Sequence, residues 1–252
     1  MSEKVAENLD KSMIVNPKYE RTDRGEFLTQ MLDELAESER HVSSKSPESS
    51  GDWTLLHDRD EAKDPENFYC WRKNTGSKTE MFTKAVMYIK GVHPINVVKA
   101  MSLKIAKELD FMRQKGPEAF QMLEENQKEH WLVCHMKKEV KKQKDRDFVT
   151  KMFTLPDGIM LPQHGNASLG CGCRFSVEHA KKPEDKSDNI RGTMKELWFV
   201  IPDPKGSKLI WLTSTEYGGE PNEEEFGKLQ PAHTKVMYCI LHKIIASLKK
   251  AV

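Results

Sequence analysis

The residues of this chain that could do chemistry form none of the familiar catalytic or cofactor motifs. There is no G-x-S-x-G nucleophile elbow, no phosphate-binding P-loop and no dinucleotide fingerprint. His130 and His135 lie on a predicted strand at an odd spacing, so they point to opposite faces and are not placed to share a metal ion. The five cysteines include no C-x-x-C pair, which disfavours a zinc ribbon. We therefore expect no catalytic residue, no metal and no cofactor.

Composition narrows the class of protein further. The formal net charge of +1 argues against a general nucleic-acid binder, because such domains are usually much more basic. No apolar run near residue 1 suits a signal peptide, and no stretch approaches the ~20 apolar residues of a membrane span. We expect a soluble, cytoplasmic, monomeric protein whose thiols are reduced.

The apolar pattern indicates the elements that would position a site. Helical spacing predicts helices over 26–40, 94–114, 118–126 and 223–252. Runs of aromatic and branched residues between turn formers predict strands over 53–58, 67–73, 79–92, 130–137, 147–154, 167–179, 192–201 and 207–215. Residues 1–25 form a polar arm without a clear period, and the serine-rich stretch 41–52 is typical of a linker inside the domain 26–252.

This order of elements predicts an α+β fold. Strands joined by short connections pair antiparallel, because parallel neighbours need long crossovers. A curved antiparallel sheet of this size has an inner face that must be covered. The last helix carries a continuous apolar stripe, so we expect the sheet to wrap around it.

Several short motifs occur in the order found in one family. Trp53 opens the first strand, and "YIKGVHPINVV" precedes the second helix. "RDFV" at 146–149, "NIRG" at 189–192 and "IPDPKGSKLIWLTSTEYGGEP" at 201–221 follow. Over roughly residues 26–250 the chain resembles the steroidogenic acute regulatory-related lipid-transfer (START) domain. The resemblance implies a helix-grip fold with a tunnel for one lipid between the sheet and the C-terminal helix.

The "RDFV" motif places a charged turn directly before a predicted strand with a mostly uncharged face. The resemblance implies that Arg146 and Asp147 fix this turn while Phe148, Thr150 and Met152 line the tunnel. Alternation by itself predicts only that the last three share a face.

The polar part of the tunnel departs from the family pattern. Sterol-binding members carry a buried arginine on the "RDF" strand, paired with an acid one strand earlier. Here Met152 takes that place and the facing stretch "HWLVCHMK" contains no acid. Head-group recognition is therefore not carried over, and His135 is the most plausible polar group of the pocket on that strand.

The predicted site combines these strands with the last helix. We predict that the lipid-binding residues are His135, Phe148, Thr150, Met152, Trp211, Thr213, His233, Met237, Ile240, Leu241 and Ile244. For Trp211 and Thr213 a pocket wall and an ordinary core remain open, and His233 is either a core or rim histidine or a ligand contact. Ile159, Met160 and Leu161 are contiguous in a proline-flanked turn, so they either pack on the sheet or form a lid that touches the membrane.

The function we expect is non-enzymatic lipid binding and transfer. One phospholipid, sterol or ceramide-like sphingolipid would lie in a hydrophobic tunnel and exchange through transient membrane contact, with no nucleic-acid partner. Two alternatives stay open: a helix-grip enzyme of the cyclase or hydrolase type, and a protein-interaction module with little pocket.

Overall fold

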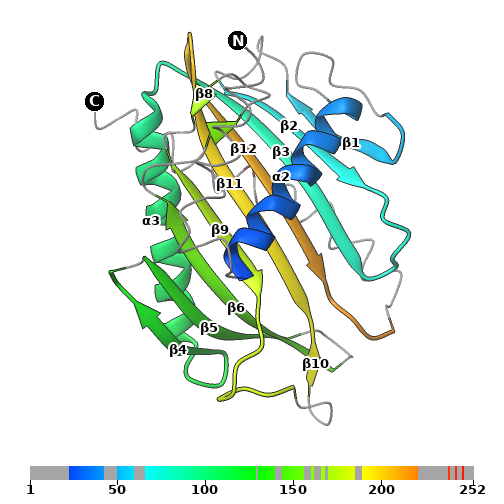
Figure 1. The fold of residues 1–252 in the computed structure, drawn as a ribbon, viewed down its shortest axis with the longest axis vertical. Helices are drawn as coiled ribbons and strands as arrows, with labels where there is room; N and C mark the ends of the chain where they lie inside the picture. The colour runs from blue at the N-terminus through cyan, green and yellow to red at the C-terminus, as the bar shows by residue number, and fades with distance from the viewer. Residues whose placement is uncertain are drawn as a thin grey trace.

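The structure, a computed structural model, describes residues 23–42, 50–59, 66–128, 130–139, 144–155, 160–161, 166–167, 170–184 and 189–220, with 238, 242 and 246. Within them, a curved sheet lies between helices α2 (Asp23–His41) and α3 (Pro94–Gln114) (Figure 1). The strands are β1 (Trp53–Arg59), β2 (Glu66–Lys73), β3 (Glu80–Lys90), β4 (Phe120–Asn126), β5 (Trp131–Lys138), β6 (Asp145–Leu155), β7 (Met160–Leu161), β8 (Asn166–Ala167), β9 (Cys171–Ser176), β10 (Asn189–Arg191), β11 (Thr193–Asp203) and β12 (Gly206–Glu216).

Among the described residues, the large sheet has ten strands, in the order β1-β2-β3-β12-β11-β9-β6-β5-β4 with β10 beside β6. Neighbours along this path pair antiparallel, as predicted, and β10 pairs parallel with β6. Strands β7 and β8 form a separate short pair.

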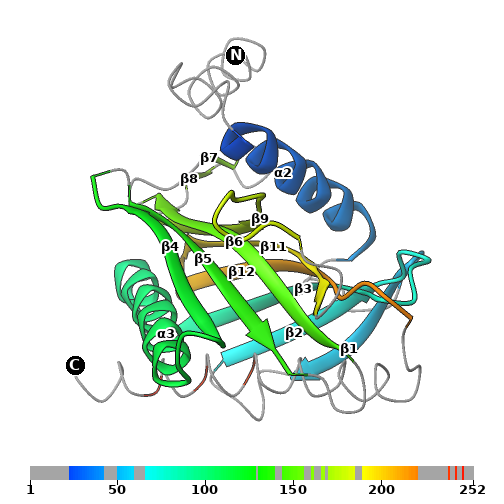
Figure 2. The ribbon, with the colours of Figure 1, turned by 90° about the horizontal axis from the view of Figure 1, so that it is seen from below.

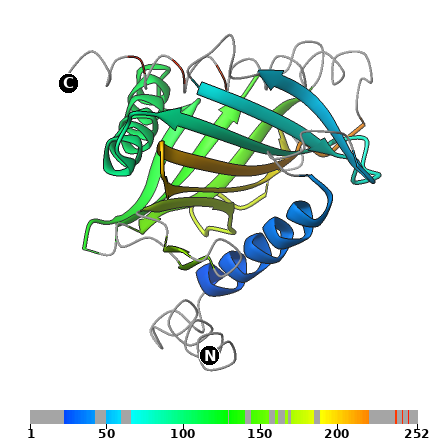
Figure 3. The same cartoon turned by 90° about the horizontal axis from the view of Figure 1, so that it is seen from above.

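The two faces of the sheet have different covers. The sheet arches so that its inner face looks toward α3, while α2 lies across the outer face (Figures 2 and 3). On the outer face, Met31 and Leu35 of α2 belong to a buried cluster with Trp53 and Phe82. We call these the inner and the outer face, and each predicted site residue can be assigned to one of them.

Helix α3 coincides with the predicted range 94–114. Pro94 stands in the first turn, where its missing N–H costs nothing, and the His93 side chain accepts a hydrogen bond from the backbone N–H of Ile95 at 3.4 Å. Gly116, at φ 93°, reverses the chain after the helix. On the inner face, Val97 and Met101 of α3 pack with apolar residues of β11 and β12.

The short helix predicted over 118–126 is wrong, because this segment is strand β4 paired with β5. Phe120 belongs to an inner-face cluster, whereas Leu123 packs on the outer face with Val133 and Val149. Residues three apart share one face of a helix, so this split requires a strand. The register also shifts between Met122 and Glu124.

The predicted C-terminal helix lies almost wholly outside the described residues. Tyr238 is described, in a helical conformation, and it is buried in the inner-face cluster with its ring centroid 5.3 Å from that of Phe68. Tyr238 therefore covers the inner face at this point. No helix among the described residues is long and apolar enough to cross a membrane.

Candidate functional site

The predicted wall residues of β6 and β12 share the inner face. Directly opposed residues on paired strands lie on the same side of a sheet, so the register assigns them. Met152 faces Arg174, which faces Glu196, which in turn faces Thr213. Phe148, Thr150, Met152, Trp211 and Thr213 are all buried on this face.

Apolar side chains cover much of this face. Phe148 and Met152 form a buried cluster with Leu109 of α3. Trp211 belongs to a second cluster with Trp198, which also contains residues of β2 and β3. Phe148, Met152 and Trp211 are therefore part of a broad apolar surface between the sheet and α3.

One row of polar side chains crosses the apolar surface. Arg174, Glu196, Thr213 and Thr83 face one another in turn on β9, β11, β12 and β3, and all four are buried. Glu108 reaches the row from α3. We call these five residues the polar row.

The charged end of the polar row is a three-membered ion pair. Arg174 donates through Nη1 to Glu108 Oε1 at 3.1 Å, and its Nε lies 3.5 Å from Glu196 Oε2. Burial works against the charge of Arg174, but Glu196 and Glu108 outweigh it and raise its pKa. The guanidinium is therefore permanently charged in an otherwise apolar wall.

The sequence carried a signal that Arg174 and Glu196 need partners, though not which partners. Arg174 stands between Cys173 and Phe175 in a strand of small and apolar residues, and Glu196 directly precedes the apolar run that begins at Leu197. A charged residue inside such a run is rarely buried without a partner. Arg174 on β9 is the direct cross-strand neighbour of Met152 on β6.

The charged start of β6 holds three segments together. Arg146 donates through Nε to the carbonyl oxygen of Tyr217 at 2.9 Å, at the end of β12. Asp147 accepts from Arg191 of β10 at 2.8 Å through Nη2 and 3.1 Å through Nε. These contacts explain why a charged turn precedes a strand with a mostly uncharged face, because they attach the start of β6 to the end of β12 and to β10.

His135 does not belong to the inner wall, and that prediction is corrected. It faces Val149, so it lies on the outer face, opposite to Thr150. Its Nε2 is 3.3 Å from Asp147 Oδ2. Burial and the nearby Lys182 lower the pKa of His135, although Asp147 acts in the opposite direction. The lowered pKa favours the neutral ring. The face of the sheet on which His135 lies follows from the register between β5 and β6, and alternation within one strand does not reveal that register.

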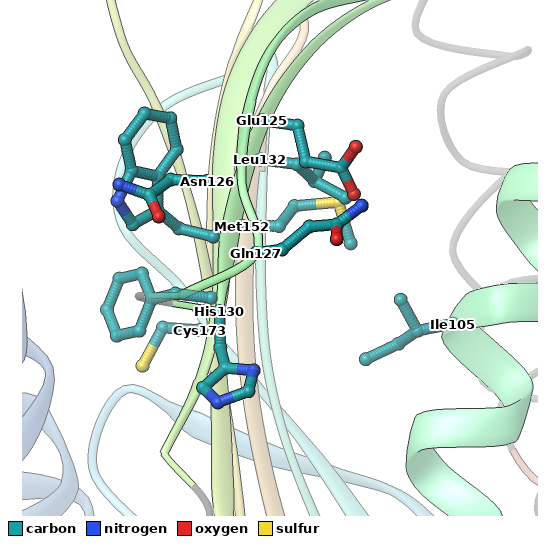
Figure 4. A pocket seen from close by; sticks show the side chains of 10 residues that line it. Ile105, Glu125, Asn126, Gln127, His130, Leu132, Met152 and Cys173 are labelled. Atoms are coloured by element: carbon teal, nitrogen blue, oxygen red, sulfur yellow. The ribbon is translucent and has the colours of Figure 1, made fainter.

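A cavity of about 260 Å³ lies at the end of the β4–β5 hairpin. Ile105 of α3 points toward Leu132 and Met152 on one side of the sheet, and Cys173 lies on the other side (Figure 4). Ligand pockets usually measure roughly 300–1,000 Å³, so this cavity alone is small for a lipid. It borders Met152, the cross-strand neighbour of Arg174, but no residue of the polar row lines it.

The remaining predicted residues have no described side chains. The helix-stripe residues and one lid residue lie outside the described residues: His233, Met237, Ile240, Leu241, Ile244 and Ile159. Met160 and Leu161 form β7, which pairs with β8, so this part of the predicted lid is a short hairpin.

Comparisons with known proteins agree with this architecture. No protein-family model matches the sequence, and no curated protein matches it. Among solved structures, human STARD10 is similar with a TM-score of 0.53 and 16% identity, over 81% of this chain and 77% of that one. Human StAR-related lipid transfer protein 5 is similar with a TM-score of 0.54 and 13% identity, over 88% of this chain and 96% of that one.

The chain therefore has the helix-grip fold of the START domains. The fold predicted from the motif order is confirmed. The motifs did not predict the polar row.

Proposed function

We propose that this protein binds one lipid between the inner face of the sheet and the C-terminal segment, and exchanges it at membranes without a chemical step. The observation that carries the proposal is the inner face itself. It presents buried apolar side chains from β6, β11, β12 and α3 around one polar row. One neighbour of the same fold is named a lipid transfer protein, which lends support.

An apolar enclosure of this kind suffices physically to hold a lipid. Each buried methylene contributes about 0.8 kcal/mol, so ten of them contribute roughly 8 kcal/mol against release into water. Release must then occur where the acyl chains meet another apolar phase. In this proposal the protein works in the cytoplasm as a monomer and touches membranes only to load and unload.

Mass spectrometry of material extracted from the purified protein tests the proposal. A lipid present at one per chain supports it. A small molecule that the protein consumes would instead indicate a helix-grip enzyme. A protein that carries nothing and takes up no lipid from vesicles would indicate an interaction module, and the proposal would fail.

Two substitutions on one strand separate lipid binding from stability. Met152 and Val149 are both buried in β6, Met152 on the inner face beside the cavity and Val149 on the outer face. Met152→Trp should lower lipid occupancy severalfold more than Val149→Trp. Urea unfolding of both variants measures the stability cost, which overpacking sets at typically about 1–3 kcal/mol in either case. Equal occupancy in two equally stable variants would mean that Met152 is plain core.

A further inference from the structure

The cavity at the end of the β4–β5 hairpin offers a route between solvent and the inner face, and the inference drawn from it rests on the proposed function. We propose that this cavity is the portal through which the apolar chain of the lipid enters and leaves the protein, between the hairpin and α3.

The first observation is that exposure falls along the cavity. At the hairpin turn its lining residues Gln127 and His130 are exposed. Farther in, Ile105 of α3 and Leu132 of β5 are half-buried, and Met152 of β6 is 6% exposed (Figure 4). One cavity therefore joins the surface of the hairpin turn to the buried wall of β6.

The second observation is that the buried end of the cavity is part of the inner face. Ile105, Leu132 and Met152 belong to the apolar cluster that also contains Leu109 of α3 and Phe148 of β6. An acyl chain that passes Ile105 therefore meets apolar side chains on its way to Phe148. Every methylene that is exposed to water during exchange raises the barrier, so a route lined by apolar side chains lowers it.

The third observation concerns how the hairpin is held. Within the described part of the chain β4 is an edge strand, and its pairing with β5 shifts register between Met122 and Glu124. Such a shift locally disrupts the ladder. The base of the hairpin is fixed, since the backbone N–H of Lys137 donates to the carbonyl oxygen of Ala119 at 2.8 Å. An edge hairpin with a fixed base and an interrupted ladder opens locally at lower cost than the central strands.

The turn of the hairpin carries a backbone signal of the same kind. His130 has φ 54°, a left-handed conformation that residues other than glycine adopt uncommonly. Residues in such conformations cluster at ligand sites and switch regions. His130 lines the cavity at its exposed end, so the turn places this residue at the mouth of the portal.

A plug at the mouth tests the portal on the full chain. The described cysteines are buried, and Cys239, which lies outside the described residues, is replaced by serine. Gln127→Cys is then labelled with N-benzylmaleimide. Lys128→Cys is the matched control, because Lys128 is exposed in the same turn but does not line the cavity. Dehydroergosterol, pyrene-labelled phosphatidylcholine and pyrene-labelled ceramide, each in dioleoyl phosphatidylcholine vesicles, serve as probes of loading and release.

The plug should act on rates and not on the amount bound. For each probe that the unlabelled protein binds, the label on Gln127→Cys should slow loading and release roughly tenfold and leave equilibrium occupancy nearly unchanged. The label on Lys128→Cys should change either rate by less than about twofold. Equal rates in the two labelled variants would overturn the portal and leave the proposed function standing. If the unlabelled protein binds none of the three probes, the proposed function fails and the portal with it.

Widening the passage gives the opposite perturbation. Ile105→Ala removes part of the lining, and Val98→Ala is the control on the same helix, because Val98 is also half-buried against an apolar cluster but does not line the cavity. Ile105→Ala should speed release about threefold more than Val98→Ala, and urea unfolding of both variants checks that they remain folded. Equal acceleration in the two variants would mean that loosened packing of α3 is the cause, which contradicts a passage at Ile105.

Discussion

Replacing Arg174 by methionine should destabilise the fold far more than replacing Arg174 and Glu196 together. Arg174→Met leaves Glu196 buried without its cation, and removing one member of a buried pair costs about 3–5 kcal/mol. Glu196→Leu leaves Arg174 with Glu108 alone and should cost less, about 1–3 kcal/mol, because the Glu108 side chain is 33% exposed and only partly compensates. The double variant Arg174→Met/Glu196→Leu should lie within about 1 kcal/mol of the wild type, since apolar replacement of a buried pair is often neutral or stabilising.

Urea unfolding of the four delipidated proteins at pH 7 measures these differences. The coupling energy between the two positions should be at least about 2 kcal/mol. If the single variants each cost under about 1 kcal/mol and their effects simply add, the pair is not buried as described. A stable double variant that has lost lipid binding would show that the charges serve the ligand and not the fold.

Three further predictions concern other parts of the molecule. Lys84 lies on the outer face, where burial lowers its pKa from the ordinary value of 10.5 to about 8. Between pH 8 and 10.5 the unfolded chain therefore binds more protons than the folded one, and the free energy of unfolding of the wild type should rise by about 3 kcal/mol. Urea titrations should show this rise in the wild type relative to Lys84→Met, and parallel curves would refute it. Gly172→Ala should cost about 1–3 kcal/mol, because a Cβ there would lie 2.5 Å from the buried Trp198 ring; thermal melts that coincide with the wild type would contradict this contact. Changing Ile159 and Leu161 to serine should slow lipid transfer between vesicles and leave the equilibrium amount of bound lipid nearly unchanged, whereas unaltered transfer would mean that this turn only packs on the sheet.

The inner wall could be predicted from local pattern because alternation is a property of one strand. Phe148, Thr150 and Met152 share a face whatever their neighbours are, and the motif order indicated which face. Trp211 and Thr213 likewise share a face of β12, but local pattern left open whether that face is a pocket wall or ordinary core. Helix α3 was predicted with its bounds because a proline, a long apolar period and a glycine mark it locally.

The polar row could not be predicted in this way because it is made by register. Arg174 and Glu196 are far apart in sequence, and their meeting depends on how β9 pairs with β11. His135 was misplaced for the same reason, since its face follows from the β5–β6 pairing. Strand β4 was predicted as a helix because its strand character is set by its pairing with β5, which local spacing does not reveal.

Photolabelling along β6 tests the central claim most directly. A lipid that carries a diazirine in its acyl chain is loaded, irradiated and located by peptide mass spectrometry. Phe148, Thr150 and Met152 face inward, whereas Val149 and Lys151 are the intervening positions on the outer face. The account predicts label on the inward residues and none on the two intervening ones. Label on Val149 or Lys151 with none on the inward residues would show that the lipid does not bind the inner face.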